Sequence, residues 1–316
     1  MRLSLASDSI SQYLTAGADA REVFSAFRDS GFACIDFGVG TRKLEGDLCA
    51  EADKWKRIFD DCGIAATQAH GPGFNPFLPL PNGVATEEYL ARGLRFCRQM
   101  QIPYMVVHPG SQPGNTRDEF FERNISYFKA LIPYVEETGV FLLVENIGHY
   151  MDPYFLWSGA DLREMVDAID HPLVGACWDI GHANHFEYLH VGGSPYDSIL
   201  ALGDKLKAIH AHDNIGFFPD PNKSKRIDMH TTPYASLRCS VNWDAVLQGL
   251  CDIGYTGTFN FECITPARAS RRPDFVYNGE VVRTLEQPPL GVWKAMNTAL
   301  YEIGRFMLQS YGAYEE

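Results

Sequence analysis

Short apolar runs alternate with longer amphipathic stretches along the whole chain. Several runs place large or β-branched side chains consecutively, which is typical of parallel strands buried on both faces. The predicted strands are Leu3–Ala6, Ala33–Phe37, Ile64–Ala69, Tyr104–Val107, Val140–Val144, Leu173–Trp178, Leu206–Ala211 and Gly257–Phe261. The stretches between them have the apolar spacing of helices. The predicted helices are Ala20–Ser30, Cys49–Cys62, Thr86–Met100, Arg117–Glu137, Ala160–Ile169, Trp243–Ile253, Val292–Leu308 and a shorter one over Tyr196–Leu202.

The connections differ in length according to which end of a strand they join. Turns before strands are short, whereas the long irregular segments follow strands: Gly71–Val84, His108–Thr116, Asn146–Gly159, Gly181–Ser194, Asn214–Asn242 and Cys263–Gly291. In a (β/α)8 barrel these segments are the loops of the C-terminal face, where active sites lie. We therefore predict an α/β protein with a (β/α)8 TIM barrel fold, in a single domain over residues 1–316. A doubly wound open sheet is the alternative, but no G-x-G-x-x-G motif follows the first strand.

Side chains of the kinds that bind metals stand at the ends of six successive predicted strands. These strands end at His70, His108, Glu145-Asn146, Asp179, His210-Ala211-His212-Asp213 and Glu262. A single histidine at a strand end is more often a hydrogen-bonded structural residue. Six strand ends in succession that each present a His, Asp or Glu favour one common site, because the strand ends of a barrel meet at one rim.

Buried carboxylates at this rim require a positive partner, because desolvating an unpaired carboxylate costs several kcal/mol. A divalent metal ion is the simplest such partner, and we predict that Glu145, Asp179, His210 and Glu262 bind one ion. Carboxylate and imidazole ligands together suit Mn²⁺, Zn²⁺, Co²⁺ or Mg²⁺, which the sequence does not separate, and no organic cofactor is predicted. His210 and His212 face the same side of their strand, so either could be the histidine ligand, with the other holding substrate or a second metal.

Composition limits the partners and the compartment. The chain has 316 residues, a formal charge of −13 and a pI near 5.2, which argue against a nucleic-acid partner because phosphates favour a basic surface. No apolar run approaches the ~20 residues that span a bilayer, and the first residues lack the apolar segment of a signal peptide. We therefore expect no membrane partner and a cytoplasmic location. The eight cysteines form no C-x-x-C pair, which predicts buried free thiols in a reducing compartment.

The strand-end motifs, taken together and in order, resemble those of the xylose-isomerase-like barrel superfamily, which contains sugar isomerases, epimerases and endonuclease IV-type enzymes. The matching pieces span most of the chain: His108-Pro109-Gly110, Val144-Glu145-Asn146, Asp179-Ile180-Gly181-His182-Ala183-Asn184, His210-Ala211-His212-Asp213, Asp228-Met229-His230 and Phe261-Glu262. The resemblance implies a TIM barrel and a metal-dependent isomerase or epimerase acting on a sugar or sugar phosphate. It also favours His210 over His212 as the ligand, because the family's ligand is the first position of that motif.

The resemblance also implies roles for the other rim residues. In the epimerase branch, the residues that match Glu145 and Glu262 bind the metal and exchange protons with the substrate. The expected substrate-binding residues are His70, His108, His182, His212, Asp228 and His230. The chemistry agrees, because moving a proton next to a carbonyl needs a base, an acid and a Lewis acid that stabilises the enediolate. Isomerase, epimerase and dehydratase are not separated at this level.

Two other functions compete with this prediction. An endonuclease IV-like enzyme that cleaves DNA at abasic sites would use a trinuclear zinc site with nine ligands. Residues of the right types occur at His70, His108, Glu145, Asp179, His182, His210, Asp228, His230 and Glu262. The third alternative is a non-catalytic sugar-binding barrel, against which the pair of Glu145 and Glu262 argues. Aromatic residues near the rim, including Phe77 and Trp178, either line a sugar site or pack the barrel.

Two predicted loops carry positive charge in an otherwise acidic chain. The loop after the seventh strand contains Lys223-Ser224-Lys225-Arg226, and the loop after the eighth contains Arg268, Arg271 and Arg272. Phosphate sites of TIM barrels frequently lie at these two loops, and arginine matches the geometry of phosphate and carboxylate. We therefore expect Arg268, Arg271 and Arg272 either to bind an anionic group of the substrate or to be solvated surface charge. The oligomeric state stays open, with a homo-oligomer among the alternatives.

Overall fold

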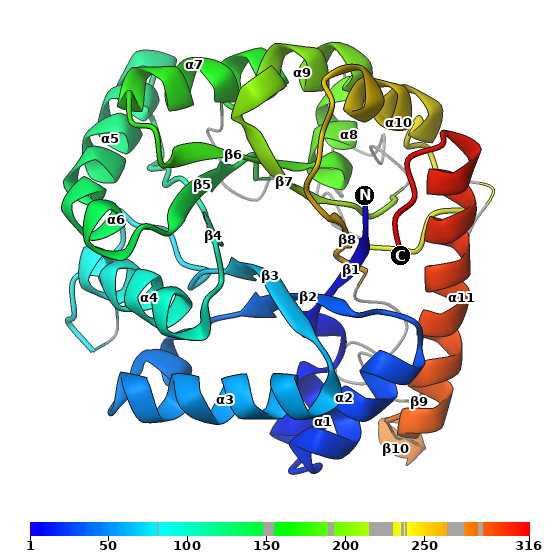
Figure 1. Ribbon diagram of the computed structural model, residues 1–316. Helices are drawn as coiled ribbons and strands as arrows, with labels where there is room; N and C mark the ends of the chain where they lie inside the picture. Colours follow the sequence, from blue (N-terminus) through cyan, green and yellow to red (C-terminus); the bar gives the residue numbers. More distant parts are fainter. Residues whose placement is uncertain are drawn as a thin grey trace.

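Eight parallel strands form a barrel in the computed structural model, which describes residues 1–80, 82–147, 155–188, 193–214, 230–234, 237, 239–263, 275–283 and 287–316. The strands are β1 (Leu3–Ala6), β2 (Cys34–Gly38), β3 (Ala65–His70), β4 (Tyr104–Val107), β5 (Phe141–Glu145), β6 (Val174–Asp179), β7 (Leu206–His210) and β8 (Phe259–Phe261). They are hydrogen-bonded in the order β7-β6-β5-β4-β3-β2-β1-β8, and helices surround them (Figure 1). The predicted TIM barrel fold is confirmed.

The barrel closes between β7 and β8 through a short parallel bridge. Ala211, directly after β7, pairs with Phe261, its N–H donates to Asn260 O at 2.8 Å, and its carbonyl accepts from Glu262 N at 3.1 Å. Closure matters for the site because it brings the ends of β7 and β8 side by side.

The helices largely follow the predicted pattern. They are α1 (Ser11–Thr15), α2 (Ala20–Asp29), α3 (Leu48–Cys62), α4 (Thr86–Met100), α5 (Arg117–Ala130), α6 (Ile132–Thr138), α7 (Gly159–Ile169), α8 (Ile180–Tyr188), α9 (Pro195–Leu202), α10 (Trp243–Asp252) and α11 (Leu290–Ser310). Polar caps fix several starts: Thr116 and Glu119 form a capping box at α5, as do Ser158 and Asp161 at α7. Gly139 ends α6 with φ +66°, the left-handed conformation expected of a glycine stop.

Three expectations about elements were wrong. The helix predicted over Arg117–Glu137 is two helices, α5 and α6, with Pro133 in the first turn of the second, where its missing N–H costs no hydrogen bond. The segment after β6, expected to be a loop from Gly181, is helix α8. The segment expected to be irregular over Cys263–Gly291 contains a hairpin of β9 (Phe275–Tyr277) and β10 (Glu280–Arg283), whose turn residues Asn278 and Gly279 have φ of +50° and +82°.

The apolar side chains divide into two cores. The larger core fills the layer between the barrel and its helices and includes Phe24, Phe37, Leu142, Trp178 and Phe259. A small separate cluster lies inside the barrel: Val106, Leu143, Cys177 and Ala208, each buried, with Tyr104 and Phe141 against it. Since side chains alternate along a strand, the next inward positions on these strands are His108, Glu145, Asp179 and His210. On β4, β5, β6 and β7 the barrel interior is therefore apolar one inward position before the rim and ionisable at the rim itself.

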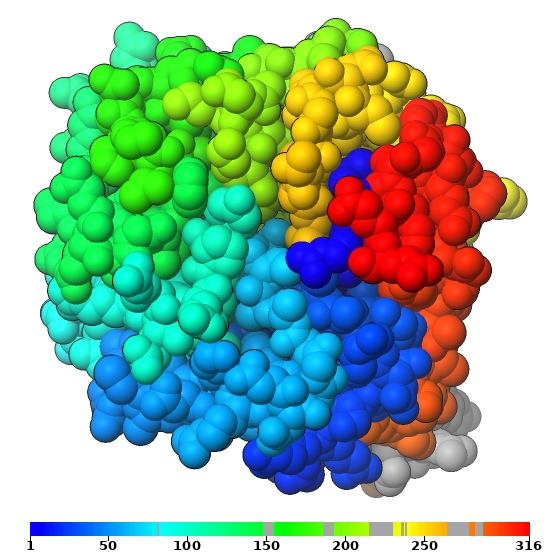
Figure 2. Space-filling model, in the orientation of Figure 1, coloured from blue at the N-terminus to red at the C-terminus, as the bar shows by residue number. Residues whose placement is uncertain are grey.

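The two ends of the chain meet on the N-terminal face of the barrel. Figure 2 shows the start of the chain and its C-terminal residues packed side by side on this face, to the right of the barrel's centre. The Glu315 N–H donates to Met1 O at 3.0 Å, and the Met1 amino group donates to Ala313 O. The ligand-type side chains at the ends of the strands lie on the opposite, C-terminal face, where the active sites of this fold are found.

The thiol prediction is confirmed in part. All eight cysteines are free, and four of them, Cys34, Cys97, Cys177 and Cys263, are buried, whereas Cys49 is exposed and the remaining three are half-buried. Within the described residues, no helix combines the length and apolar character needed to cross a membrane.

Candidate metal centre

The four predicted metal ligands come from four strand ends. Glu145, Asp179 and His210 are the last residues of β5, β6 and β7, and Glu262 directly follows β8. Asp179 and His210 are register partners across β6 and β7, so their side chains point to the same side. The structure brings all four together: each offers one ligand atom, and these atoms lie within 4.8 Å of one another.

His210 stands at the centre of this cluster. Its Nδ1 lies 3.1 Å from Glu145 Oε1, 3.1 Å from Glu262 Oε2 and 3.9 Å from Asp179 Oδ2. The four side chains are buried, with Glu262 the most accessible residue at 6% exposure. The geometry places His210, rather than His212, with the three carboxylates.

Burial and neighbouring histidines act in opposite directions on the two glutamates. Burial alone would raise the pKa of Glu145, but the charge of His210 and hydrogen bonds from His108, His210 and His70 outweigh it and hold this pKa well below its usual range. The pKa of Glu262 is likewise lowered, because the charges of His210 and His230 outweigh burial. Both glutamates are therefore ionised at neutral pH.

Two of the neighbouring histidines, His70 and His210, have raised pKa values. Burial would lower the pKa of His70, but its hydrogen bond and charge interaction with Glu145, and the charge of Glu262, raise it to about 10. Burial opposes protonation of His210 too, yet electrostatic interactions with Cys177, Glu145 and Glu262 raise its pKa well above the usual value. Because a histidine must be deprotonated to bind a metal, a divalent ion would take over the role of the proton on His210.

The donor set fits a divalent ion. Three buried carboxylates and one imidazole supply oxygen and nitrogen donors without a thiolate, which suits Mn²⁺, Co²⁺, Zn²⁺ or Mg²⁺. Asp179 Oδ2 is buried and accepts no hydrogen bond within the described part of the chain, although such an atom normally has a partner. A cation bound among the four ligands would satisfy it.

A second group of ligand-type residues lies beside Glu145. His108 Nε2 is 3.2 Å from Glu145 Oε2, His70 Nε2 is 3.6 Å from the same oxygen, and the two ring nitrogens are 3.0 Å apart. These two predicted substrate-binding residues therefore share Glu145 with the four-residue cluster, and a cation could also be held by the three of them.

A third group lies on the other side of Asp179. His182, His212 and His230 offer ligand atoms within 4.8 Å of one another, and the rings of His212 and His230 stack with centroids 3.9 Å apart. His212 Nε2 is 3.1 Å from Asp179 Oδ1, which links this group to the four-residue cluster. Gly181 permits the arrangement, because a Cβ there would lie 2.0 Å from His212 Cε1.

Hydrogen bonds at the start of α8 hold Asp179 and His182 in place. The Asn146 amide donates to Asp179 O at 2.8 Å and its oxygen accepts from Asp179 N at 2.7 Å. Asp179 Oδ1 accepts from His182 N at 2.6 Å, and His182 Nδ1 lies 3.0 Å from Asn146 O. The carboxylate that ends β6 thus also caps the helix that follows.

One ionisable residue of the site was missed by sequence reasoning. Asp36 of β2 is 1% exposed, and its Oδ2 lies 3.0 Å from His210 Nε2, on the side of the ring away from the three carboxylates. The signal was present, because a charged residue inside an apolar strand is itself an anomaly. The remaining predicted residues, Asp228, Arg268, Arg271 and Arg272, lie outside the described residues.

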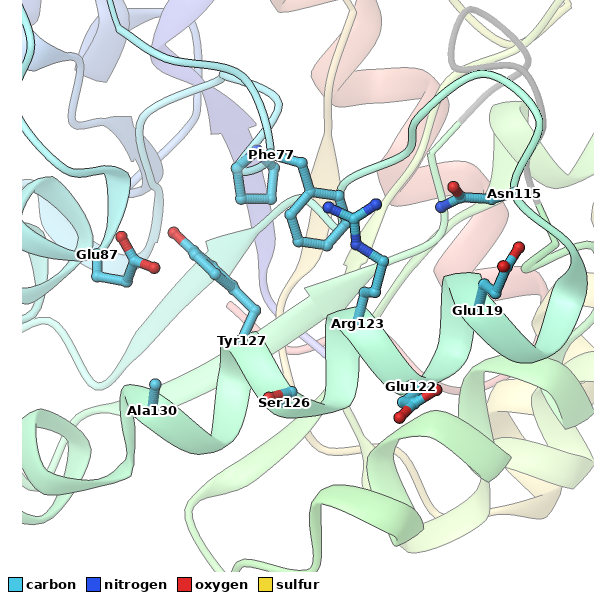
Figure 3. A pocket seen from close by; sticks show the side chains of 10 residues that line it. Phe77, Glu87, Asn115, Glu119, Glu122, Arg123, Ser126, Tyr127 and Ala130 are labelled. Atoms are coloured by element: carbon cyan, nitrogen blue, oxygen red, sulfur yellow. The ribbon is translucent and has the colours of Figure 1, made fainter.

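A further hollow lies outside the barrel and contains none of the clustered residues. It has a volume of about 640 Å³ and lies between α5 and the segment after β3, as Figure 3 shows. Phe77 lines it with the Arg123 guanidinium 4.6 Å from its ring centroid. Of the aromatic residues considered for the rim, Phe77 therefore packs here, and Trp178 lies in the outer core.

Comparison with known proteins identifies the family. The model of the xylose isomerase-like TIM barrel family matches residues 19–279. An uncharacterized protein from Methanocaldococcus jannaschii is 26% identical over 183 residues, which are 56% of this chain and 56% of that protein. The chain thus spans little more than half of that relative. A probable endonuclease 4 from Methanoculleus marisnigri is 29% identical over 227 residues, covering 63% of this chain and 74% of that protein.

Solved structures agree with the fold. D-psicose 3-epimerase with D-tagatose, from Clostridium cellulolyticum H10, superposes with a TM-score of 0.69 at 15% identity, covering 98% of this chain and 99% of that one. The IOLI protein with a bound zinc atom has a TM-score of 0.64 at 14% identity and covers both chains fully, at 100% each. At these identities the likeness shows the fold. With a family match over more than half of its length, the chain belongs to the xylose isomerase-like TIM barrel family.

Proposed function

We propose that the protein is a divalent-metal-dependent isomerase or epimerase that acts on a sugar or sugar phosphate. The observation that carries the proposal is the placement of two ionised glutamates, Glu145 and Glu262, each with an oxygen 3.1 Å from His210 Nδ1. They come from strands separated by β6 and β7 around the barrel, so they approach the cluster from different directions. The likeness to D-psicose 3-epimerase and the family match support this choice of substrate class.

The residues have distinct tasks in this proposal. Glu145, Asp179, His210 and Glu262 would hold the metal, which when bound supplies Lewis acidity toward adjacent carbonyl and hydroxyl oxygens of the sugar. One ionised glutamate removes the proton from the carbon next to the carbonyl. The other glutamate first takes up a proton, from solvent or from a neighbouring histidine, and then donates it to the enediolate. His108, 3.2 Å from Glu145 Oε2, is placed to exchange a proton with that carboxylate.

The test is exchange of a carbon-bound proton with solvent. Metal-loaded protein is incubated in D₂O with ketoses, aldoses, sugar phosphates and sugar acids, and NMR follows deuterium at the carbon next to the carbonyl. We expect exchange with at least one class, slowed about 100-fold or more in Glu262→Gln, the scale of general acid–base loss. Glu137→Gln, which changes an exposed carboxylate paired with Arg95, is the matched control and should exchange normally.

Two outcomes contradict the proposal. Binding of a sugar without exchange in the metal-loaded protein indicates the non-catalytic sugar-binding barrel. Exchange that is equally fast in wild type and Glu262→Gln removes the glutamate from the chemistry. Anionic sugars belong in the panel because Arg268, Arg271 and Arg272 are proposed to bind an anionic group of the substrate.

A second candidate function is favoured by the two further histidine groups. His70 and His108 with Glu145, and His182 and His230 with His212, could hold additional ions on either side of the four-residue cluster. This is the arrangement expected if the protein is an endonuclease IV-like enzyme with three zinc ions, and the similarity to a probable endonuclease 4 supports it. Cleavage of a duplex that contains an abasic site, together with three zinc ions per chain, would establish this function instead.

A further inference from the structure

A second layer of polar residues lies inside the barrel, one inward position before the rim. Gln68 precedes His70 by two residues, and Asn260 precedes Glu262 by two, so each faces the interior beneath a rim residue. Asp36 lies between them on β2 and is the register partner of Gln68. All three side chains are buried, with at most 2% exposure.

These residues converge on one carboxylate oxygen. Asp36 Oδ2 accepts a hydrogen bond from Gln68 Nε2 at 2.9 Å and from Asn260 Nδ2 at 3.2 Å, and it lies 3.0 Å from His210 Nε2. Asp36 Oδ1 has no hydrogen-bond partner among the described residues. The carboxylate is therefore fixed by two amides and aimed at a single ring nitrogen.

Packing does not require a charge at this depth. On β5, β6 and β7 the corresponding positions, two residues before Glu145, Asp179 and His210, are Leu143, Cys177 and Ala208, which form the small apolar core of the barrel. A buried carboxylate costs several kcal/mol to desolvate unless its partners compensate. Asp36 is thus explained by what it contacts rather than by the space that it fills.

The contact determines which nitrogen of His210 carries a proton. Nδ1 faces Glu145, Glu262 and Asp179, so it must offer a lone pair to any ion held there. The ring proton then belongs on Nε2, where Asp36 Oδ2 accepts it. Carboxylate partners of this kind fix the tautomer and orientation of histidines that bind metals.

We propose that Asp36, held by Gln68 and Asn260, is a positioning residue that fixes the ring and tautomer of His210 for metal binding. The inference rests on the proposed function only in that His210 is a metal ligand; it does not depend on which reaction follows. In this role Asp36 acts through His210. It does not contact the carboxylates of Glu145, Asp179 and Glu262 or the reacting atoms of the substrate.

The test measures metal affinity rather than turnover. Metal-free protein is titrated with Co²⁺, whose visible absorption reports binding, in wild type and in Asp36→Asn. We expect the dissociation constant to rise by about 10- to 100-fold, the usual effect of losing such an outer partner. The control is Ser4→Ala: Ser4 is fully buried on β1, is the register partner of Asn260, and its Oγ has no hydrogen-bond partner among the described residues. The affinity of the Ser4→Ala variant for Co²⁺ should equal that of wild type.

A second readout separates positioning from a general loss of structure. Nitrogen-15 NMR of the Zn²⁺-loaded protein should show His210 protonated at Nε2 in wild type, with that tautomer lost or mixed in Asp36→Asn. If Asp36→Asn does not fold, Gln68→Met replaces it, and we expect that variant to weaken Co²⁺ binding several-fold.

An affinity of Asp36→Asn within twofold of wild type, or of Gln68→Met where that variant is needed, would overturn the inference. The outcomes for the proposed function are separate. If the variant binds metal more weakly but wild type exchanges no carbon-bound proton of any sugar, the role of Asp36 stands and the proposed isomerase function is contradicted.

Discussion

Replacing Glu145 by glutamine is expected to lower activity on the true substrate by a factor of about 100 or more while leaving the fold intact. Glu145 contributes to two groups at once: one oxygen lies 3.1 Å from His210 Nδ1, and the other lies 3.2 Å from His108 Nε2. Glutamine keeps the size of the side chain but removes the charge and the capacity to accept a proton. Steady-state turnover, with circular dichroism to verify folding, measures the effect.

The matched control for this variant is Glu164→Gln. Glu164 is an exposed carboxylate paired with Arg117, so its replacement tests the loss of a carboxylate outside the barrel. Exposed pairs of this kind contribute little to stability, and normal activity is expected. Normal turnover in purified, folded Glu145→Gln would contradict the proposed chemistry.

Removal of the metal is expected to abolish activity and to lower the melting temperature. The four ligands come from β5, β6, β7 and the end of β8, and the unfolded chain does not gather them. An ion that binds only the folded state stabilises it by about 2.7 to 4.1 kcal/mol at roughly 100 to 1,000 times its dissociation constant. For a protein of this size that corresponds to a fall in melting temperature of roughly 4 to 6 °C.

Differential scanning calorimetry before and after treatment with EDTA measures this shift. Return of both activity and melting temperature on adding the metal back shows that EDTA acted through the ion. His210→Ala serves as the control, because EDTA should no longer shift its melting temperature. An unchanged melting temperature of the wild type after verified metal removal would speak against an ion shared by four strand ends.

The barrel strands were predictable because burial on both faces leaves continuous apolar runs. Seven of the eight differ from the prediction by at most one residue at either end, and β8 begins two residues later than expected. Helix α8 was missed because it lacks an amphipathic pattern: His182, Asn184 and His185 are polar yet buried. The β9–β10 hairpin had a readable signal, since Asn278-Gly279 stands between two β-rich segments.

The site was predictable at its rim and less so beneath it. Strand ends point to one side of a barrel, so the types of residue there sufficed to propose Glu145, Asp179 and Glu262 as neighbours. Choosing between His210 and His212 needed the family motif, because both face inward and differ only in depth. Asp36 is recognisable in the sequence as a charge inside an apolar strand, but its role is not, because its partner His210 is 174 positions away and meets it only when β2 and β7 face each other across the barrel.

The metal content of the purified protein tests the central claim most directly. Elemental analysis is carried out on wild type and on His210→Ala, both dialysed against the same low concentration of Mn²⁺ and Zn²⁺. One divalent ion per wild-type chain and almost none in His210→Ala is the result that this account predicts. Equal metal content in the two proteins would show that Glu145, Asp179, His210 and Glu262 do not form the site, and three zinc ions per wild-type chain would contradict a mononuclear isomerase.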